Sequence, residues 1–358
     1  MSRYIIRRLL LTIPVLAGIL ILVFFLSHIL PGSQCRALIG ERATDAMCAD
    51  FDHLHGLDLP VYQQFVNYVA GLAQGDLGAS VKTSQPVTTL LIERLPVTIE
   101  LSFYALLFAV PLGVLLGIVS ASRRNSSMDV VTMAGANLGV SVPIFVLGLM
   151  LAFVFSYLLK GTVLWLPPSG RLTPGLTITP LVVSWGLEDL KGPLRNIIDF
   201  FSNIYTFNAL ITAQWVIFVD AFRHLILPAI ALGTIPLAII ARITRSSLLD
   251  VLGLDYIRTA RAKGLSDKAV VRHHALPNSM LPVVTIFGLQ VGALLGGAVL
   301  TETIFNLSGV GRAVSESIAS RDYAVVQGFV VVIAIGYMFV NLAVDISYAF
   351  LDPRIRLQ

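Results

Sequence analysis

Between two strongly apolar regions, the chain reads Asp255-Tyr256-Ile257-Arg258-Thr259-Ala260-Arg261-Ala262-Lys263-Gly264-Leu265 before it reaches Leu276-Pro277. An acid at the start and cations toward the end suit the dipole of a short helix, and a glycine commonly ends one. Ser266 or Asp267 can cap a second helix. We expect that helix to run to His274, and Leu276-Pro277 to turn the chain into the next apolar stretch. The sequence therefore predicts a basic helix–turn–helix between two membrane spans.

The composition is that of a membrane protein. The 358 residues are 56% hydrophobic and 13% charged, and mean hydropathy is +0.82, whereas a soluble domain has about 25% charged residues. A helix needs about 20 apolar residues to cross a bilayer. We predict an all-α, polytopic helical membrane protein with six transmembrane helices. Their apolar stretches are 9–30, 99–120, 130–159, 225–243, 280–301 and 325–350.

Basic residues gather on one side of these stretches, which sets the orientation. Arg7 and Arg8 precede the first stretch, and Arg123 and Arg124 occupy the short loop after the second. Both termini are therefore predicted to be cytoplasmic. The first stretch is too long for a signal peptide and lacks an A-x-A-like cleavage site, so we expect a retained span.

The predicted organisation is an N-terminal span (1–30), a periplasmic loop region (31–98) and a core (99–358) that holds the remaining five spans. The core includes a periplasmic insertion (160–222) and the cytoplasmic loop (246–278). Two interrupted apolar segments of the insertion are expected to lie in the membrane interface; if both crossed, the chain would have eight spans. These segments are 178–187 and 205–222. In the loop region, helical spacing predicts a short amphipathic helix with Tyr62, Phe65, Val66, Val69 and Leu72 on one face.

Cys35 and Cys48 both fall in the predicted periplasmic loop, where a disulfide is permitted; two free buried thiols are the alternative. No cysteine or histidine spacing indicates a metal site, and the sequence contains neither a Walker A pattern nor H-E-x-x-H. The acids within the predicted spans, Glu100 and Asp345, have no obvious partner. We therefore expect a non-catalytic subunit without a cofactor of its own.

Glycines four residues apart allow helix backbones to approach closely. Gly113 and Gly117 indicate ordinary bundle packing in the second predicted span, whereas Gly288, Gly292 and Gly296 in the fifth fit either packing or a functional face. Gln290 lies about half a helical turn from that stripe, and could face a water-filled path or a neighbouring helix.

The basic segment resembles the coupling loop of ABC-importer permeases, whose pattern is E-A-A-x-x-x-G-x9-I-x-L-P. Arg258-Thr259-Ala260, Gly264, His274 and Leu276-Pro277 align with it. The chain departs from the pattern at the Glu, the first Ala and the Ile, as the peptide-transporter branch does. An anchor to anionic lipid is the simpler alternative, but it does not explain the small residues Ala260, Ala262 and Gly264.

Nearly the whole chain resembles the inner-membrane permeases of the dipeptide/oligopeptide/nickel family, B type. It departs at Ser33-Gln34-Cys35, where an acid and a proline usually follow Pro-Gly. The matching motifs are Arg7-Arg8-Leu9, Pro31-Gly32, Gly56-Leu57-Asp58-Leu59-Pro60, Gly75-Asp76-Leu77-Gly78-Ala79-Ser80, Arg94-Leu95-Pro96, Arg242-Ile243-Thr244-Arg245-Ser246-Ser247 and Leu300-Thr301-Glu302-Thr303-Ile304-Phe305.

The resemblance implies the type I ABC-importer permease fold in the bacterial inner membrane and alternating access for dipeptides or small oligopeptides. It implies as partners a second permease, one or two cytoplasmic ATPases that use ATP and Mg, and a periplasmic peptide-binding protein, within membrane lipid and without nucleic acid. The expected ATPase-coupling residues are Asp255, Tyr256, Arg258, Thr259, Ala260, Arg261, Ala262, Lys263 and Gly264. Residues expected along the path are Gln290, Thr301 and Glu302, and those expected to receive the binding protein are Asp76, Leu77, Gly78 and Ser80.

Other readings remain open at this point. Relatives with this pattern also carry nickel chelates, haem, oligosaccharides or glutathione. A self-sufficient channel or a proton-coupled carrier would work without an ATPase and would usually need a paired acid and base within the membrane. A membrane-anchored scaffold would need neither the coupling loop nor the glycine stripe.

Overall fold

The computed structural model describes residues 2–29, 32–296 and 298–351. All regular structure in these residues is helical. In chain order the helices are α1 (Ser2–Ile29), α2 (Gln34–Ile39), η1 (Gly40–Arg42), α3 (Asp45–Leu54), α4 (Val61–Ala73), α5 (Val87–Ser122), α6 (Ser127–Ser141), α7 (Ile144–Ala152), η2 (Phe153–Leu158), α8 (Leu181–Ser184), α9 (Pro193–Ser202), α10 (Tyr205–Ile211), α11 (Trp215–Leu252), α12 (Asp255–Ala262), α13 (Asp267–Ala269), η3 (Val270–Ala275), α14 (Leu276–Leu295), α15 (Val299–Ile304), α16 (Val310–Ala319) and α17 (Tyr323–Leu351).

Within the described residues, five helices are long and apolar enough to cross a membrane, and a bent pair makes a sixth if the pair counts as one span. The five lie in α1, α5, α11, the continuous helix Asp267–Leu295 and α17, and the bent pair is Ser127–Ser141 with Ile144–Leu158. This agrees with the predicted polytopic helical fold. The amphipathic helix predicted in the external loop region is present as α4.

The stretch 130–159 was expected to be one span, and the structure bends it by 98° between α6 and α7. The bend lies at Val142-Pro143. A residue before proline is pushed out of the helical region by the proline ring, and Val142 is extended, with φ −82° and ψ 124°. Pro143 then precedes the first turn of α7, where its missing N–H is not needed.

The prediction of a turn at Leu276-Pro277 is wrong, because one helix runs from Asp267 to Leu295. Pro277 lies in the first turn of α14, directly after the π-helical turn η3. Local π geometry re-satisfies backbone groups that a proline leaves without a partner. The far end also differs from the expected 280–301: α14 ends at Leu295, and the separate helix α15 carries Thr301.

Two spans begin earlier than the apolar stretches suggested. α5 begins at Val87 instead of residue 99, and α11 begins at Trp215 instead of residue 225. The expected interfacial segment 205–222 is therefore divided between the short helix α10 and the first turns of α11. Segment 178–187 holds only the single turn α8, so neither segment adds a span.

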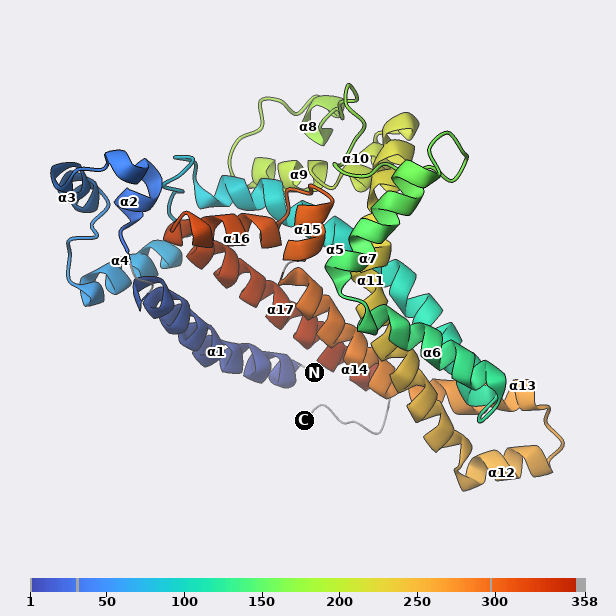
Figure 1. Ribbon diagram of the computed structural model, residues 1–358. Helices are drawn as coiled ribbons and strands as arrows, with labels where there is room; N and C mark the ends of the chain where they lie inside the picture. The colour runs from blue at the N-terminus through green and yellow to red at the C-terminus, as the bar shows by residue number, and fades with distance from the viewer. Residues whose placement is uncertain (1, 30–31, 297, 352–358) are drawn as a thin grey trace.

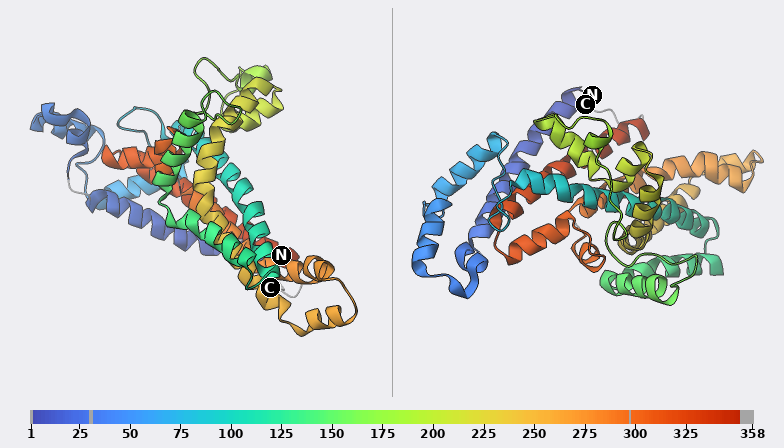
Figure 2. Two further views of the ribbon diagram at one scale, coloured as in Figure 1. Left: turned by 45° about the vertical axis from the view of Figure 1, so that its right-hand side comes forward. Right: turned by 90° about the horizontal axis from the view of Figure 1, so that it is seen from above.

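The loops and short helices gather at two opposite ends of the long helices (Figure 1). α12 projects at one end, and the loop between α5 and α6 lies beside α13 there. The first residues of α1 and the last of α17 also lie toward this end in the left view of Figure 2. At the opposite end lie α8, α9 and α10, together with α15 and α16. The arrangement matches the charge-based orientation, in which the α12 end is cytoplasmic.

The long helices α5 and α11 form the centre of the protein and approach closely along their length. A Cβ on Gly113 would lie 2.8 Å from the carbonyl oxygen of Leu237, and one on Gly117 would lie 2.7 Å from that of Ala241. A Cβ on Gly233 of α11 would in turn lie 2.8 Å from the carbonyl oxygen of Ala105. These glycines are therefore packing residues, as expected of Gly113 and Gly117.

Candidate coupling site

Helix α12 ends in a glycine motif that fixes the direction of the following chain. Gly264 has φ +83°, a conformation that costs glycine little. Its N–H donates to the carbonyl of Arg261 at 2.9 Å, and the N–H of Leu265 donates to the carbonyl of Ala260 at 3.4 Å. These two bonds are the Schellman pattern. Ser266 then caps the next helix by accepting from the N–H of Ala269.

One face of α12 is seated on the ends of the long helices. Ile257 is completely buried and Ala260 is 7% exposed. Both belong to an apolar cluster, here called the seat, that joins α5, α11, α12 and η3. Its buried members are Ala121, Leu248, Ile257, Ala260, Val270 and Ala275. Because buried side chains interlock closely, the seat holds α12 firmly against α5, α11 and η3.

The other face of α12 is open to contact. All the expected coupling residues except Ala260 are exposed. Arg258 and Arg261 make only surface ion pairs, with Asp255 at 3.2 Å and Asp267 at 3.1 Å. Such pairs contribute about 0–1 kcal/mol each. The guanidinium groups are therefore available to a partner at little cost.

Tyr256 ties α12 to the start of α14. Its hydroxyl donates to the carbonyl of His274 at 3.3 Å and accepts from the side-chain amide of Asn278 at 3.2 Å. The same amide also bonds the His274 carbonyl at 2.8 Å. This bracing of the loop by Asn278 was not expected from the sequence, because it depends on the continuous helix through Pro277.

A second brace near the α12 end was also missed. Arg245 of α11 grips Asp129 of α6 with two bonds of 2.8 Å. Asp129 accepts in addition from the Ser120 hydroxyl and from the N–H of Asn125. Paired, planar contacts of this kind are the stronger class of ion pair. This pair could not be predicted from the sequence, since nothing in the spacing links residues 116 apart.

The residues expected to receive a binding protein divide into two sets. Asp76 and Gly78 are exposed, and the Asp76 carboxylate accepts from the N–H of Gly78 at 2.8 Å. Leu77 is half-buried, and Ser80 is 3% exposed. The Ser80 hydroxyl donates to Asp322 at 2.5 Å. This loop is therefore anchored to the α16–α17 link through its inward-facing residues.

Thr301 and Glu302 lie inside the protein, not on a wall open to a passage. Glu302 is completely buried and Thr301 is 2% exposed. The Glu302 carboxylate accepts from the Thr98 hydroxyl at 2.7 Å and from the N–H of Arg312 at 2.8 Å. It thus serves the first turn of α16, whose N–H groups lack partners within the helix. Burial raises the pKa of this carboxyl.

Gln290 is half-buried on α14. The glycine stripe of the same helix packs against α17: a Cβ on Gly292 would collide with the ring of Tyr337, and one on Gly288 with Val344. Packing therefore accounts for these two glycines. Gly296 ends α14 and makes no such contact with α17.

Glu100 was expected to have no partner, and the structure gives it one. Arg171 of the external insertion donates to Glu100 at 2.7 Å, and their side chains are 14% and 1% exposed. The other oxygen of Glu100 accepts from the N–H and hydroxyl of Thr206. Arg171 also lies over the ring of Tyr205. This pair docks the insertion onto α5.

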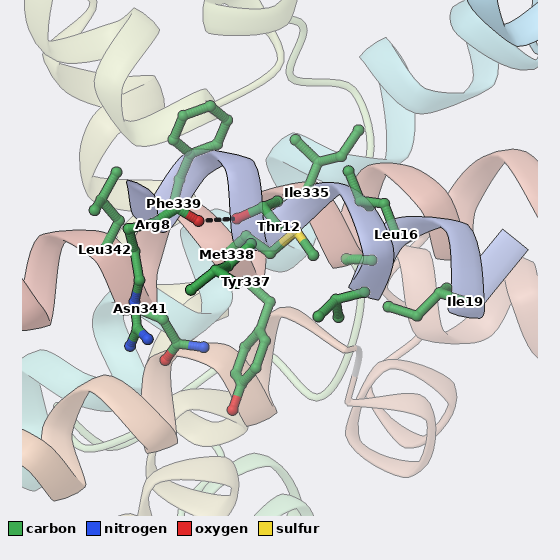
Figure 3. A pocket seen from close by; sticks show the side chains of 13 residues that line it. Arg8, Thr12, Leu16, Ile19, Ile335, Tyr337, Met338, Phe339, Asn341 and Leu342 are labelled. Carbon is green, nitrogen blue, oxygen red and sulfur yellow. Dashed lines mark hydrogen bonds between the residues drawn. The ribbon is translucent and has the colours of Figure 1, made fainter. Parts of the chain in front are cut away.

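Asp345 also has a partner, because it pairs with Arg8. This pair lies near a groove of about 530 Å³ between α1 and α17, where Thr12 donates to the Arg8 carbonyl (Figure 3). The groove is lined mainly by aliphatic and aromatic side chains, and its arginine is already paired. Such a lining does not recognise a charged ligand, so we assign it no role in handling cargo.

Two further expectations concern covalent and metal chemistry. Cys35 and Cys48 are joined in a disulfide that links α2 to α3. Within the part of the chain that the structure describes, His, Cys, Asp and Glu side chains form no group of three that could hold a metal ion.

Comparison with known proteins identifies the family. The description "Binding-protein-dependent transport system inner membrane component" matches residues 113–357, and the N-terminal component of the same systems matches residues 1–102. The chain is 44% identical to a dipeptide transport system permease protein DppB of Alkalihalophilus pseudofirmus, over 99% of this chain and 100% of the relative.

Two more relatives agree. A di/tripeptide transport system permease protein DppB of Pseudomonas aeruginosa is 45% identical, with both chains fully covered. A probable D,D-dipeptide transport system permease protein DdpB of Escherichia coli is 42% identical, over 95% of this chain and 94% of the relative. With its apolar spans and projecting, seated α12, the chain belongs to the family of inner-membrane components of binding-protein-dependent transport systems.

Proposed function

We propose that this chain is the permease subunit of an ATP-driven importer of dipeptides or small oligopeptides, and that α12 couples it to an ATPase. The exposed basic face of α12, held by a buried seat on three spans, is the observation that carries the proposal. The relatives named for dipeptide transport favour this cargo over nickel chelates, haem or glutathione.

The seat suggests how movement passes through the protein. ATP and Mg are used by one or two cytoplasmic partner subunits, which grip the exposed face of α12. Ile257 and Ala260 transmit the displacement to Leu248 of α11 and Ala121 of α5. Since both helices continue to the external end, the movement opens or closes the path that this chain forms with a second permease.

On the external side, we propose that the exposed turn at Asp76 and Gly78 contacts the peptide-binding protein. Ser80 and Leu77 hold that turn in place from behind. For the path, Gln290 remains the candidate among the residues named from the sequence. Thr301 and Glu302 would take part only after a rearrangement that exposes them, since both are buried in this conformation.

Charge reversal tests the coupling role. The double variant Arg258→Glu with Arg261→Glu should reduce ATPase co-purification and ATP-driven dipeptide uptake at least tenfold, because about 1.4 kcal/mol of lost binding is tenfold. The melting temperature should stay unchanged, since both arginines make only surface pairs. The readouts are co-purification in detergent and uptake in proteoliposomes.

Arg36→Glu is the matched control, because Arg36 makes a similar exposed pair with Asp45 on the external side. It should leave both readouts intact. Unchanged uptake and co-purification in the double variant would refute the coupling role of α12. If the chain instead purifies without any partner and transports dipeptides without ATP, the result would favour a self-sufficient carrier.

A further inference from the structure

A polar pocket of about 270 Å³ lies at the external end of the molecule. Its walls come from three parts of the chain: the loop between α4 and α5, the first turns of α5, and the α16–α17 hairpin. Figure 1 shows α16 lying along the start of α5. The volume falls just below the range of about 300–1,000 Å³ common for small-molecule sites, so the space suits a compact ligand.

Two of the charged side chains around the pocket already satisfy each other. Arg312 donates to Glu316 at 2.8 Å and to the side-chain oxygen of Asn306 at 2.6 Å. Arg94 is different. Its guanidinium reaches only the carbonyl of Ser308, at 3.5 Å, and it forms no ion pair with any residue that the structure describes. Two cations on the pocket therefore lack an ion pair within the described residues: Arg94, which is half-buried, and Lys82, which is exposed to water.

An acid on the same pocket also retains bonding capacity. Asp322 is 2% exposed. Its Oδ2 accepts from Ser80 at 2.5 Å and from the N–H of Lys82 at 3.3 Å, but its Oδ1 has no hydrogen-bond partner among the described residues. A buried carboxylate oxygen without a donor is costly. A cationic donor arriving through the pocket would supply the missing bond.

Apolar side chains line part of the pocket, beside small polar residues such as Thr83 and Ser308. Phe329 is completely buried, Val325 is 3% exposed and Leu90 is 8% exposed, and all three contact the pocket. A ligand that fits this lining has one anionic group, one cationic group and an apolar body. A short peptide with free termini has that composition.

We propose that this pocket binds a dipeptide-sized zwitterion on the outer face of the permease. Arg94 receives the terminal carboxylate through its paired N–H groups, and Asp322 receives the ammonium group by a small shift that uncovers Oδ1. The apolar wall accepts one side chain. The ligand class is that of the proposed cargo, and to this extent the inference depends on the proposed function. A selective outer site would mean that the permease contributes to the choice of cargo.

Calorimetry on the full-length chain in lipid nanodiscs tests the proposal, with Ala-Phe as the probe. N-acetyl-Ala-Phe lacks the ammonium group, and Ala-Phe amide lacks the carboxylate. We expect Ala-Phe to bind at least tenfold more tightly than either analogue. Equal affinity for all three peptides, or no binding, would overturn the inference.

Two variants test which residue binds each terminus of the peptide. Arg94→Gln should weaken Ala-Phe at least tenfold and leave Ala-Phe amide unchanged, because the amide has no carboxylate to lose. Asp322→Asn should weaken Ala-Phe and leave the acetylated peptide unchanged. Arg195→Gln and Glu188→Gln, on the external insertion, are the matched controls. A variant that weakens the binding of all three peptides equally would contradict the assignment. If Asp322→Asn fails to fold, Arg94→Gln and the two analogues still test whether the pocket binds both termini.

Uptake assays with the partner ATPase separate this inference from the proposed function. ATP-driven uptake of Ala-Phe without calorimetric binding to the pocket would overturn the outer site and leave the importer standing. Binding with the expected selectivity but no ATP-driven uptake would support the site and contradict the importer.

Discussion

At the scale of single residues, Gly264 depends on its backbone conformation and Glu302 on its burial. Gly264 is open on all sides, since an added Cβ would meet nothing within 4 Å, yet its φ is +83°. Glu302 is an acid placed among apolar helices, where it serves a helix start instead of solvent. Each position can be tested by a substitution that changes one physical property.

Gly264→Ala isolates the backbone requirement of the coupling loop. The added methyl group meets no neighbour, so the cost is that of a positive φ in a residue with a Cβ, about 1 kcal/mol. We expect a lower melting temperature and weaker ATPase co-purification. Gly18→Ala, which is equally uncrowded and has no positive φ, should have neither effect. Equal behaviour of the two variants would contradict the proposed role of the Schellman turn.

Glu302→Gln tests the consequence of burial. Burial raises the pKa of the Glu302 carboxyl in the folded protein, because the charged form loses water. Its stabilising contribution is then complete below the ordinary glutamate value of about 4.3, and it is lost as pH rises through the raised value. The glutamine variant cannot show this loss.

The melting temperature of the wild type should therefore fall relative to that of Glu302→Gln as the pH rises above the ordinary glutamate range. Thermal unfolding in detergent across that range gives the difference, with the exposed Glu188→Gln as control. A difference that does not vary with pH, or varies in the opposite direction, would show that burial does not control this carboxyl.

At the scale of elements, α5 and α11 form the main pair. Their 36 and 38 residues correspond to about 54 and 57 Å at 1.5 Å per residue, longer than a bilayer core of about 30 Å. The excess lets α5 contact the external insertion through Glu100 and the seat through Ala121. Close glycine contacts keep the two helices together over this length.

Gly117→Ala tests that contact. The new Cβ would lie 2.6 Å from the Cβ of Thr244 and 2.7 Å from the carbonyl oxygen of Ala241, so the helices must separate. Overpacking of this kind costs about 1–3 kcal/mol. The melting temperature should fall, whereas Gly135→Ala on α6, which meets nothing within 4 Å, should not lower it. A stable Gly117 variant would mean that the pair tolerates wider spacing.

At the scale of the whole molecule, three polar pairs hold outlying segments to the helical core. Arg171 and Glu100 hold the external insertion, Ser80 and Asp322 hold the outer loop, and Arg245 and Asp129 hold the α12 end. Loss of one partner from such a pair leaves a buried charge, which is worse than loss of both.

Arg171→Met should therefore destabilise the protein by about 3–5 kcal/mol and expose the insertion to protease. The double variant Arg171→Met with Glu100→Gln should recover part of the lost stability, because the unpaired buried charge of Glu100 is removed. Arg195→Met is the control, since the side chains of its pair with Asp199 are 34% and 32% exposed and the stranded Asp199 keeps contact with water. Thermal unfolding and limited proteolysis report the result. No recovery in the double variant would contradict a buried-charge origin.

The features that depend on neighbouring residues could be predicted from the sequence. Apolar length set the spans, basic loops set the orientation, and Asp255, Gly264 and Ser266 set the start and end of the coupling helices. Pro143 broke a span and Pro277 did not, although the two look alike in sequence. What differs is the surrounding geometry, a 98° bend in one case and a π-helical turn in the other.

Which polar groups meet depends on how the packed helices lie in space. Glu100 finds Arg171 at a separation of 71 residues, Thr98 finds Glu302 at 204, and Ser80 finds Asp322 at 242. Periodicity and capping act over a few residues and carry no information about such distances. A polar group that is removed from water is costly unless it forms a hydrogen bond. In this protein the packing of the helices supplies the bonding partner.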